Sequence, residues 1–400
     1  MAWEILAGKM KATDLTTGLP PARLSSAGAR VKQKVSRLIA RTTETLMPDM
    51  VSRRRERRDW ERWVHSLTPE LLSELPESAL EVKRRVFEAN VTRVEIETHA
   101  KCNRICSFCP NAIMDRRMNN TLADAAMLDR VFDELGSIDY QRQICVARYS
   151  EPLTNKPYLY ERLASARARA PRAVLAITTN TDYLTAAVLK QLRDVGLNTM
   201  YMSLYLRDNE KWSLELARTY SNRLAKKLGV RILTQRETPV SVQCTYKYAD
   251  VELSSTCHNW DEYGIDRGGL IQIYSQQGRL GPCRDPFQTF VIDYNGTVTP
   301  CCCVRSDLAQ HSKFLMGDLS APDTSIFDVY AGRLAAWRRG VVSFGEKASP
   351  CSSCRHRDIR EDLAAPIAAL LVGQLQKIGL DDRHRSGSGT PARGNLSCGT

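Results

Sequence analysis

Three cysteines within eight residues, Cys102, Cys106 and Cys109, constrain this chain more than any other feature of its sequence. Three thiolates can bind three irons of a cubane cluster and leave the fourth iron without a protein ligand, whereas iron–sulfur clusters otherwise usually take four cysteines. A zinc site is the alternative, with His99 or another residue as the fourth ligand. Zinc sites usually show paired Cys-x-x-Cys spacing, which this compact triplet lacks. The spacing therefore favours an iron–sulfur cluster with one open corner.

The residues that surround the triplet predict a parallel α/β sheet. Residues 91–97 alternate apolar and polar side chains as a strand does, and the triplet follows at once. In parallel α/β folds, ligands gather at the carboxyl ends of the strands, where the triplet, Glu151 and Asn180 are then expected to meet. Further strand-like runs alternate with helical stretches, which predicts βαβ units in a closed or open sheet. The strand-like runs are 143–149, 173–179, 198–206 and 240–246, and the helical ones 123–135, 158–170 and 185–195.

Changes of pattern divide the chain into four expected parts. A helical, basic N-terminal extension begins with about 30 polar residues of disordered composition. A core of alternating strands and helices follows, then a small domain of short strands and turns, then a C-terminal helix and a disordered tail. The four parts are residues 1–90, 91–268, 269–360 and 361–400.

The third part, residues 269–360, contains the clearest turn signal of the chain. Asn295-Gly296 lies between apolar runs at 289–293 and 297–299, which predicts a strand–turn–strand unit. A helix is expected at about 326–338. A second is expected at about 359–378 despite Pro366, and the tail from residue 381 is rich in Gly, Ser and Arg.

Of the thirteen cysteines of the chain, six form a second group that is separate from the triplet. A disulfide framework would fit a small secreted chain, and this sequence is neither small nor preceded by a secretory signal pattern. Clustered thiolates in a reducing compartment more often bind metal. Four of these thiols would suit a closed site, either zinc or [4Fe–4S]. The second group consists of Cys283, Cys301, Cys302, Cys303, Cys351 and Cys354.

The charge of the chain narrows its expected partners. The formal net charge is +12, and part of it lies in the basic run at residues 53–58. Stacking aromatics are scarce beside this run, so a solvated helix face is favoured over nucleic-acid binding. An anionic substrate or an acidic electron-transfer protein also fits the charge. No run of roughly 18 to 20 apolar residues could span a bilayer, and a soluble, cytoplasmic protein is expected.

The triplet and its surroundings resemble the radical S-adenosylmethionine (SAM) superfamily, whose hallmark is CxxxCxxC with an aromatic residue, here Phe108, before the last cysteine. The resemblance implies a partial (β/α)6 barrel and a [4Fe–4S] cluster whose open iron binds SAM. One electron then cleaves SAM to methionine and a 5′-deoxyadenosyl radical, which takes a hydrogen atom from a substrate. It also implies that Ser150 and Glu151 belong to the motif that meets the SAM amino group, although Tyr149 and Ser150 replace its glycines. Asn180 and Ser203 occupy positions that match SAM-contacting residues of the family.

The second cysteine group resembles the SPASM domain and its shortened form, called twitch. The resemblance runs from Cys283 through Gly296 to Cys301 and ends at Cys351-Ser-Ser-Cys354. It implies one auxiliary [4Fe–4S] cluster held by these four cysteines. Cys302 or Cys303 could substitute for Cys301, because adjacent residues of a strand point in opposite directions.

The spacing of the auxiliary ligands is most similar to that of an aminocyclitol-oxidising dehydrogenase of the superfamily. This resemblance implies oxidation of a hydroxyl group of a sugar, aminocyclitol or nucleoside to a ketone, with Arg267 receiving the hydroxyl proton. Flavodoxin or ferredoxin would supply electrons. An epimerase would instead need a thiol hydrogen donor, for which Cys257 and Cys244 are candidates. Peptide modification and a non-catalytic zinc protein are the remaining alternatives.

Overall fold

The computed structural model describes residues 48–207, 209–272 and 278–380. The disorder expected for the first 30 residues and for the tail from residue 381 lies outside these residues. The chain separates into two compact units, Met1–Asp59 and Trp60–Thr400. Only the beginning of helix α2 (Pro48–His65) is described for the first unit, and its residues 52–58 are mostly exposed. Every strand of the described residues and both cysteine groups belong to the second unit.

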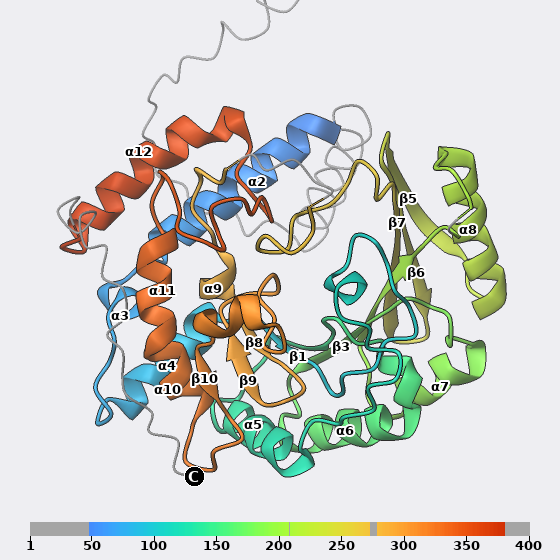
Figure 1. Cartoon of the computed structure of the whole chain (residues 1–400), viewed down its shortest axis with the longest axis horizontal. Helices are drawn as coiled ribbons and strands as arrows, with labels where there is room; N and C mark the ends of the chain where they lie inside the picture. The colour runs from blue at the N-terminus through green and yellow to red at the C-terminus, as the bar shows by residue number, and fades with distance from the viewer. Residues whose placement is uncertain (1–47, 208, 273–277, 381–400) are drawn as a thin grey trace, which may run out of the picture. The chain divides into compact units, whose positions relative to one another are not determined.

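Within the described chain, ten strands form one sheet in the order β10-β9-β8-β1-β2-β3-β4-β7-β6-β5 (Figure 1). Its central six strands, from β8 to β7, are mutually parallel. This arrangement confirms the expected partial barrel. The parallel strands are β1 (Arg93–Ile96), β2 (Gln143–Val146), β3 (Val174–Thr179), β4 (Thr199–Leu204), β7 (Val251–His258) and β8 (Thr289–Ile292). The antiparallel ones are β5 (Ile232–Thr238), β6 (Ser241–Tyr248), β9 (Thr297–Thr299) and β10 (Gly317–Asp318).

The strand expected at residues 240–246 is present as β6, but the expected parallel pairing is wrong. β6 pairs antiparallel with both β5 and β7, so these three strands form a meander at one edge. The hairpin between β6 and β7 turns at Ala249, whose φ of 51° lies in the left-handed region. β5 and β7 were not predicted, because a helix was expected before each strand and a hairpin connection contains none.

The sixth parallel strand, β8, comes from the part of the chain assigned to the small C-terminal domain. It pairs with β1, from Arg93 with Thr289 to Ile96 with Ile292. β9 then returns antiparallel through the predicted Asn295-Gly296 turn, where Gly296 has a φ of 78°. The second cysteine group is therefore joined to the barrel by a continuous sheet.

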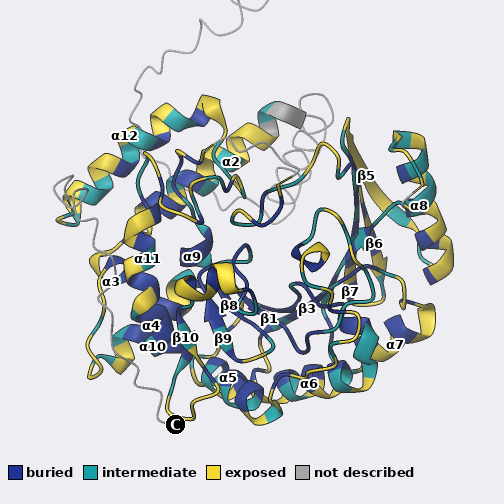
Figure 2. Ribbon diagram, in the orientation of Figure 1, coloured by how far each residue is buried: buried dark blue, intermediate teal, exposed yellow. Residues whose placement is uncertain are grey.

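Helices α5 (Ala125–Ser137), α6 (Lys156–Arg169), α7 (Ala186–Asp194) and α8 (Leu214–Leu228) lie along the outer face of this sheet (Figure 1). Side chains of Asp124, Asn155, Thr185 and Ser213 cap their first turns by accepting backbone N–H bonds. Such caps satisfy N–H groups that have no partner within the helix. The buried residues of these helices pack against alternate residues of the strands (Figure 2).

The helix expected at 326–338 is broken into α10 (Ile326–Ala331) and α11 (Arg333–Val341) at Gly332. The other described helices are α3 (Pro69–Leu72), α4 (Leu80–Asn90), α9 (Asp285–Gln288) and α12 (Glu361–Lys377), the last confirming the expected C-terminal helix. Phe87 of α4 contacts the rings of Phe290, Phe327 and Tyr330 at centroid distances of 5.2–5.5 Å. The end of the helical extension therefore packs as part of the second unit's core.

The two faces of the sheet have opposite character. On β4, Met200, Met202 and Leu204 enter the apolar core under the helices, while Thr199, Tyr201 and Ser203 face the other way. The inner face of the partial barrel is therefore partly polar. Among the described residues, no helix is long and apolar enough to cross a bilayer.

Candidate functional site

The loop after β1 carries the three cysteines of the triplet, and their thiols are partly covered. Cys109 N–H donates to the carbonyl of Cys106 over 2.9 Å, which folds the end of the triplet into a tight turn. Burial raises the pKa of Cys102 to about 11 and also raises that of Cys109. Thiolates become stable in such surroundings when a metal supplies positive charge. The triplet therefore fits a metal cluster.

His99, the proposed fourth ligand of a zinc site, is already engaged. Its Nε2 lies 2.8 Å from Thr154 Oγ1 and 3.2 Å from the Glu151 carbonyl, and its Nδ1 lies 3.2 Å from Thr98 Oγ1. Burial lowers the pKa of His99 to about 4, so the ring is neutral. With both ring nitrogens occupied by oxygen partners, His99 does not complete the triplet. The donor set is three thiols with an open position, as an open-cornered cluster requires.

Glu151 joins the carboxyl ends of β2 and β3. Its Oε1 accepts from Leu153 N–H at 3.0 Å and from the Thr179 hydroxyl at 2.7 Å, and its Oε2 accepts from Asn180 N–H at 2.6 Å. Burial raises the pKa of Glu151 to about 7 despite these donors. The carboxylate thus fixes the shape of the two loops beside the triplet. Its predicted contact with SAM remains a prediction.

A polar network ties the triplet loop to the loop after β3. Asn180 Nδ2 donates to Asn103 Oδ1 at 2.8 Å, and Arg104 donates two hydrogen bonds to Asp182 at 2.6 and 2.7 Å. Asn103 donates to the same carboxylate. Thr181, between these residues, has a φ of 69°. Asn180 thus lies beside the triplet as predicted, and its hydrogen bond holds Asn103, one of the residues between Cys102 and Cys106.

Aromatic rings line the other side of the triplet. Phe108 stacks on Trp260 with a centroid distance of 4.0 Å and an interplanar angle of 9°, and Tyr205 lies 5.3 Å from Phe108. Burial raises the pKa of Tyr205, and a hydrogen bond with Ser203 acts in the opposite direction. The sequence analysis missed Trp260 and Tyr205. Their positions in the sequence could have identified them, because Tyr205 directly follows β4 and Trp260 comes shortly after the end of β7.

Cys257, a candidate hydrogen donor, lies in the apolar core and not beside the triplet. It pairs in register with Leu204 and is fully buried in the apolar core, whereas its neighbours Thr256 and His258 take the inner face. Cys244 on β6 belongs to the same core. The structure therefore groups both candidate hydrogen donors with the core and not with the triplet, because a strand presents alternate residues to opposite faces.

The second cysteine group surrounds a buried guanidinium that the sequence analysis did not single out. Arg279 is 1% exposed and donates 2.8 Å hydrogen bonds to the carbonyls of Cys354 and Pro282, and a further one to that of His356. Cys283, Asp358, Cys354 and Cys351 raise its pKa against the effect of burial, and Asp358 forms an ion pair with it at 3.6 Å. A cluster with four thiolate ligands is anionic, so a buried cation beside three of them fits it.

The loop that carries Cys301, Cys302 and Cys303 is held from the barrel side. Arg148 donates to the carbonyl of Val304 at 2.6 Å and forms an ion pair with Asp293 at 2.5 Å. The Tyr149 hydroxyl donates a 2.6 Å hydrogen bond to the Cys302 carbonyl. Tyr149, which replaces a glycine of the family's motif, and the preceding Arg148 thus position the second cysteine group.

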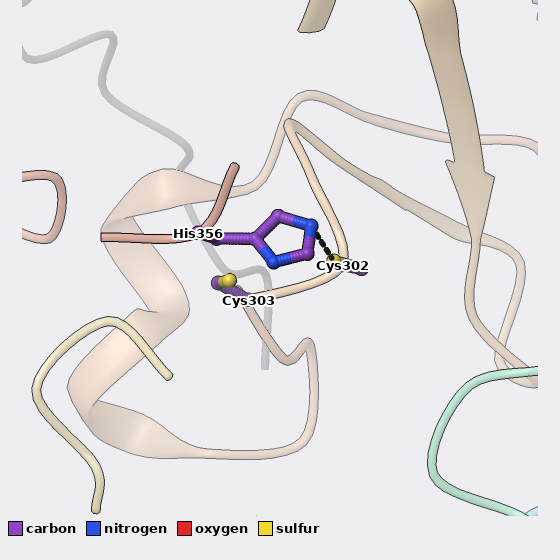
Figure 3. A group of neighbouring side chains, drawn as sticks. All are labelled: Cys302, Cys303 and His356. Atoms are coloured by element: carbon purple, nitrogen blue, oxygen red, sulfur yellow. Dashed lines mark hydrogen bonds between the residues drawn. The ribbon is translucent and has the colours of Figure 1, made fainter. Parts of the chain in front are cut away.

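The thiols of this loop are not equivalent. Cys303 is 2% exposed and its Sγ lies 3.9 Å from Cys354 Sγ. Cys302 Sγ lies 3.6 Å from His356 Nε2 (Figure 3). Among the described residues, Cys302, Cys303 and His356 are the group whose donor atoms all lie within 4.8 Å of one another.

Arg267 interacts electrostatically with thiols of both cysteine groups. It has a φ of 52°, and it follows Asp266, which accepts backbone N–H bonds from Gly268 and Gly269. Burial acts to lower the pKa of Arg267, but Tyr149, Cys303, Cys302 and Cys109 raise it above its usual value. Arg267 is thus close to a thiol of each group and stays protonated. A guanidinium already carries its full complement of protons and is suited to donate hydrogen bonds, and the expected role of Arg267 in receiving a proton stays a prediction.

Comparisons with known proteins agree with this geometry. The radical SAM superfamily matches residues 96–228, and the iron–sulfur cluster-binding SPASM domain matches residues 283–355. A curated relative from Niallia circulans, the S-adenosyl-L-methionine-dependent 2-deoxy-scyllo-inosamine dehydrogenase, is 24% identical over 272 residues, which cover 67% of this chain and 94% of the relative.

Three solved structures have related chains. BtrN in complex with AdoMet and 2-DOIA is 21% identical, covers 66% of this chain and 93% of its own, and gives a TM-score of 0.49. Native anSMEcpe with AdoMet and a peptide is 13% identical over 71% of this chain and 97% of its own, with a TM-score of 0.37. SuiB of Streptococcus suis bound to the precursor peptide SuiA is 12% identical over 68% of this chain and 71% of its own, with a TM-score of 0.35.

Proposed function

This chain belongs to the radical SAM superfamily and carries a SPASM domain, and from that premise we propose that it oxidises a hydroxyl group of a small molecule to a ketone. The substrate class is a sugar, aminocyclitol or nucleoside. The relative from Niallia circulans supports the class, since its name describes the dehydrogenation of an aminocyclitol.

The observation that carries the proposal is the electrostatic interaction of Arg267 with thiols of both cysteine groups. Oxidation of a hydroxyl-bearing carbon requires removal of a hydrogen atom, a proton and an electron. When bound, the cluster at Cys102, Cys106 and Cys109 together with SAM supplies the hydrogen-abstracting radical, and the auxiliary cluster at Cys283, Cys301, Cys351 and Cys354 supplies an electron acceptor. A substrate beside Arg267 lies within reach of both.

Arg267 acts on the substrate oxygen as a fixed cation. Because it stays protonated, its N–H groups stabilise negative charge that develops on the hydroxyl oxygen as the proton leaves to solvent water. It is therefore proposed as an electrostatic catalyst and not as the proton acceptor.

The inner face of the barrel supports a polar substrate. Tyr201 and Ser203 of β4 face inward, as do Ser254 and Thr256 of β7, which are their partners in register. Gln143 of β2 donates a 2.9 Å hydrogen bond to the Tyr201 hydroxyl. Hydroxyl and amide groups at these positions provide partners for a hydroxylated ligand.

The roles of the SAM-contacting residues remain proposals. Glu151 and Ser150 shape the end of β2, Asn180 holds the triplet loop, and Ser203 faces inward beside Tyr205. Phe108 covers the triplet through its stack on Trp260. An acidic flavodoxin or ferredoxin is proposed as the electron donor, since the chain carries a net charge of +12.

Product analysis under anaerobic conditions tests the function. Reduced, reconstituted enzyme is incubated with SAM and candidate hydroxylated substrates, and products are identified by mass spectrometry. A ketone that lacks two hydrogen atoms supports dehydrogenation, whereas a product of unchanged mass that carries solvent deuterium identifies an epimerase. Cys257→Ala is expected to keep turnover, because Cys257 is a core residue.

Arg267→Lys is the matching test of the site. We expect ketone formation to fall by about 100-fold while SAM cleavage continues, because the planar array of donors is lost. Exposed Arg231→Lys serves as the control for the same substitution. Equal loss of both reactions in Arg267→Lys, or no loss of either, would contradict the assigned role.

A further inference from the structure

The second cysteine group contains more metal donors than one auxiliary cluster uses. The SPASM pattern accounts for Cys283, Cys301, Cys351 and Cys354. Cys302, Cys303 and His356 remain, and they come from two segments more than 50 residues apart. The fold nevertheless brings their donor atoms within 4.8 Å of one another (Figure 3). A surplus of soft donors that converge on one point is a feature of a built metal site and not of a hydrophobic core.

The spacing of these donors suits a single ion. An ion bound tetrahedrally with metal–sulfur bonds of about 2.3 Å and metal–nitrogen bonds of about 2.0–2.1 Å places its donors about 3.5–3.8 Å apart. The distance from Cys302 Sγ to His356 Nε2 is 3.6 Å. The pair therefore already has the separation that two ligands of one ion require.

A carboxylate lies beside the imidazole, outside the group of three converging donors. Asp285 Oδ2 lies 3.2 Å from His356 Nε2, on the same ring nitrogen that faces Cys302. The other oxygen, Oδ1, pairs with Arg357 Nη1 at 3.2 Å, which fixes the orientation of the carboxylate. Asp285 is 4% exposed, so the group is shielded from bulk water. Two thiolates and one imidazole form a donor set that zinc and ferrous iron both accept, with the fourth position available to water.

Hydrogen bonds to the backbone, and not to the thiols themselves, hold Cys302 and Cys303 in place. Tyr149 binds the Cys302 carbonyl, and Arg148 binds the Val304 carbonyl, so the backbone on both sides is fixed. Cys303 Sγ lies 3.9 Å from Cys354 Sγ, which puts the group next to the auxiliary ligands. First ligands supported by a second layer of hydrogen bonds are typical of metal sites.

We propose that Cys302, Cys303 and His356 bind one thiophilic divalent ion, zinc or ferrous iron, beside the auxiliary cluster. The proposal depends on the four SPASM ligands but not on the identity of the substrate or on the reaction. The ion neutralises the buried thiolates and fastens the loop after β9 to the segment after Cys354.

Metal analysis of the intact, cluster-loaded protein tests the proposal. Anaerobically reconstituted enzyme is washed with chelator and titrated with cobalt(II), and thiolate-to-cobalt charge-transfer absorption is recorded. We expect one cobalt ion to bind per chain and zinc to displace it. Cys302→Ala and His356→Ala are expected to weaken binding by about 100-fold or more. The electron paramagnetic resonance signal of the reduced auxiliary cluster is expected to stay.

Control variants separate this site from the clusters and from folding. Cys145→Ala removes a buried thiol outside both groups and is expected to bind cobalt as the parent does. Cys302→Ser and His356→Asn preserve side-chain size, and they replace the alanine variants if those do not fold. Absence of a cobalt–thiolate band in the parent overturns the proposal. Loss of the auxiliary signal in Cys302→Ala also overturns it, because Cys302 would then be a cluster ligand. Neither measurement involves substrate, so failure of the proposed oxidation leaves the result unaffected.

Discussion

The two cysteine groups that interact with Arg267 are supported in different ways. The triplet is confined to one loop, whose position depends on Asn103, Arg104 and their partners after β3. These contacts are only partly buried, since the side chains of Arg104 and its partner Asp182 are 30% and 31% exposed. The second group gathers thiols from three segments, and those of Cys283, Cys351 and Cys354 lie near the buried Arg279. A loop that must bind and release SAM keeps an accessible side, whereas a site that only transfers electrons can be closed.

The difference also appears in the neighbouring charges. Around the triplet, the ion pair of Arg104 with Asp182 lies near the surface, where such pairs contribute little to stability. Around the second group, Arg279 satisfies backbone carbonyls in the interior, where its removal leaves buried acceptors without a partner. The first site is therefore held by many weak contacts and the second by a few strong ones.

Loss of a single thiol should separate the two groups most sharply. Cys106→Ala is expected to lose roughly four irons and to abolish SAM cleavage, because the cluster with the open corner cannot form. Cys351→Ala is expected to lose a similar amount of iron but to keep SAM cleavage without ketone formation. Iron analysis and quantification of 5′-deoxyadenosine provide the measurements, with Cys244→Ala as control. Identical behaviour of the two variants would show that the groups form one functional unit.

Removal of the buried cation should have the next largest effect. Arg279→Met is expected to destabilise the protein by about 3–5 kcal/mol and to prevent assembly of the auxiliary cluster, because anionic thiolates lose their counter-charge. Thermal unfolding and iron content of the purified protein measure both effects. The exposed Arg231→Met is the matched control. An auxiliary cluster that assembles normally in Arg279→Met would contradict this role.

Glu151 should give the triplet side a distinctive pH dependence. Burial raises its pKa from 4.5 to about 7, so the folded protein binds this proton more tightly than the unfolded chain does. Its contribution to stability is therefore present at low pH and is lost as pH rises from 4.5 to about 7, by about 3 kcal/mol.

Comparison of the wild type with Glu151→Gln isolates this effect. The difference in unfolding free energy between the two proteins should change across pH 5 to 8, and denaturant titrations at each pH measure it. Exposed Glu88→Gln serves as the control for the same substitution. A constant difference for Glu151→Gln would mean that Glu151 is ionised throughout.

The smallest effect is expected at the partly exposed ion pair of the triplet loop. Asp182→Asn weakens two charge-assisted hydrogen bonds from Arg104, a loss of about 1 kcal/mol or less. This predicts a roughly five-fold weaker affinity for SAM with unchanged iron content. Isothermal titration with SAM gives the affinity, and Asp194→Asn, at the surface pair with Lys190, is the control. Loss of iron from Asp182→Asn would place this pair among the strong contacts instead.

The sequence predicted the parallel part of the fold and the ligand sets from local signals. The alternation of strand and helix around residues 91–206 located four of the six parallel strands, and Asn295-Gly296 located the β8–β9 hairpin. Cysteine spacing separated the triplet from the second group. These features are readable because periodicity and turn chemistry act over a few residues.

Other features were not predictable because they depend on the pairing of distant segments. The direction of β6 depends on its partners β5 and β7, and the position of β8 depends on β1, almost 200 residues away. Cys257 was a plausible hydrogen donor by residue type, but strand register directs it into the core. Arg279 and Trp260 had no spacing signal, since their partners lie in other elements.

The amino-acid sequence by itself determined the chemistry available to this protein, because three closely spaced thiols and a second cysteine set define iron–sulfur sites by their donor atoms. The tertiary structure alone decided how these sites meet. It placed Arg267 where thiols of both groups act on it and converged Cys302, Cys303 and His356 on one point. Such contacts arise when packing of the sheet brings together loops that no local rule connects.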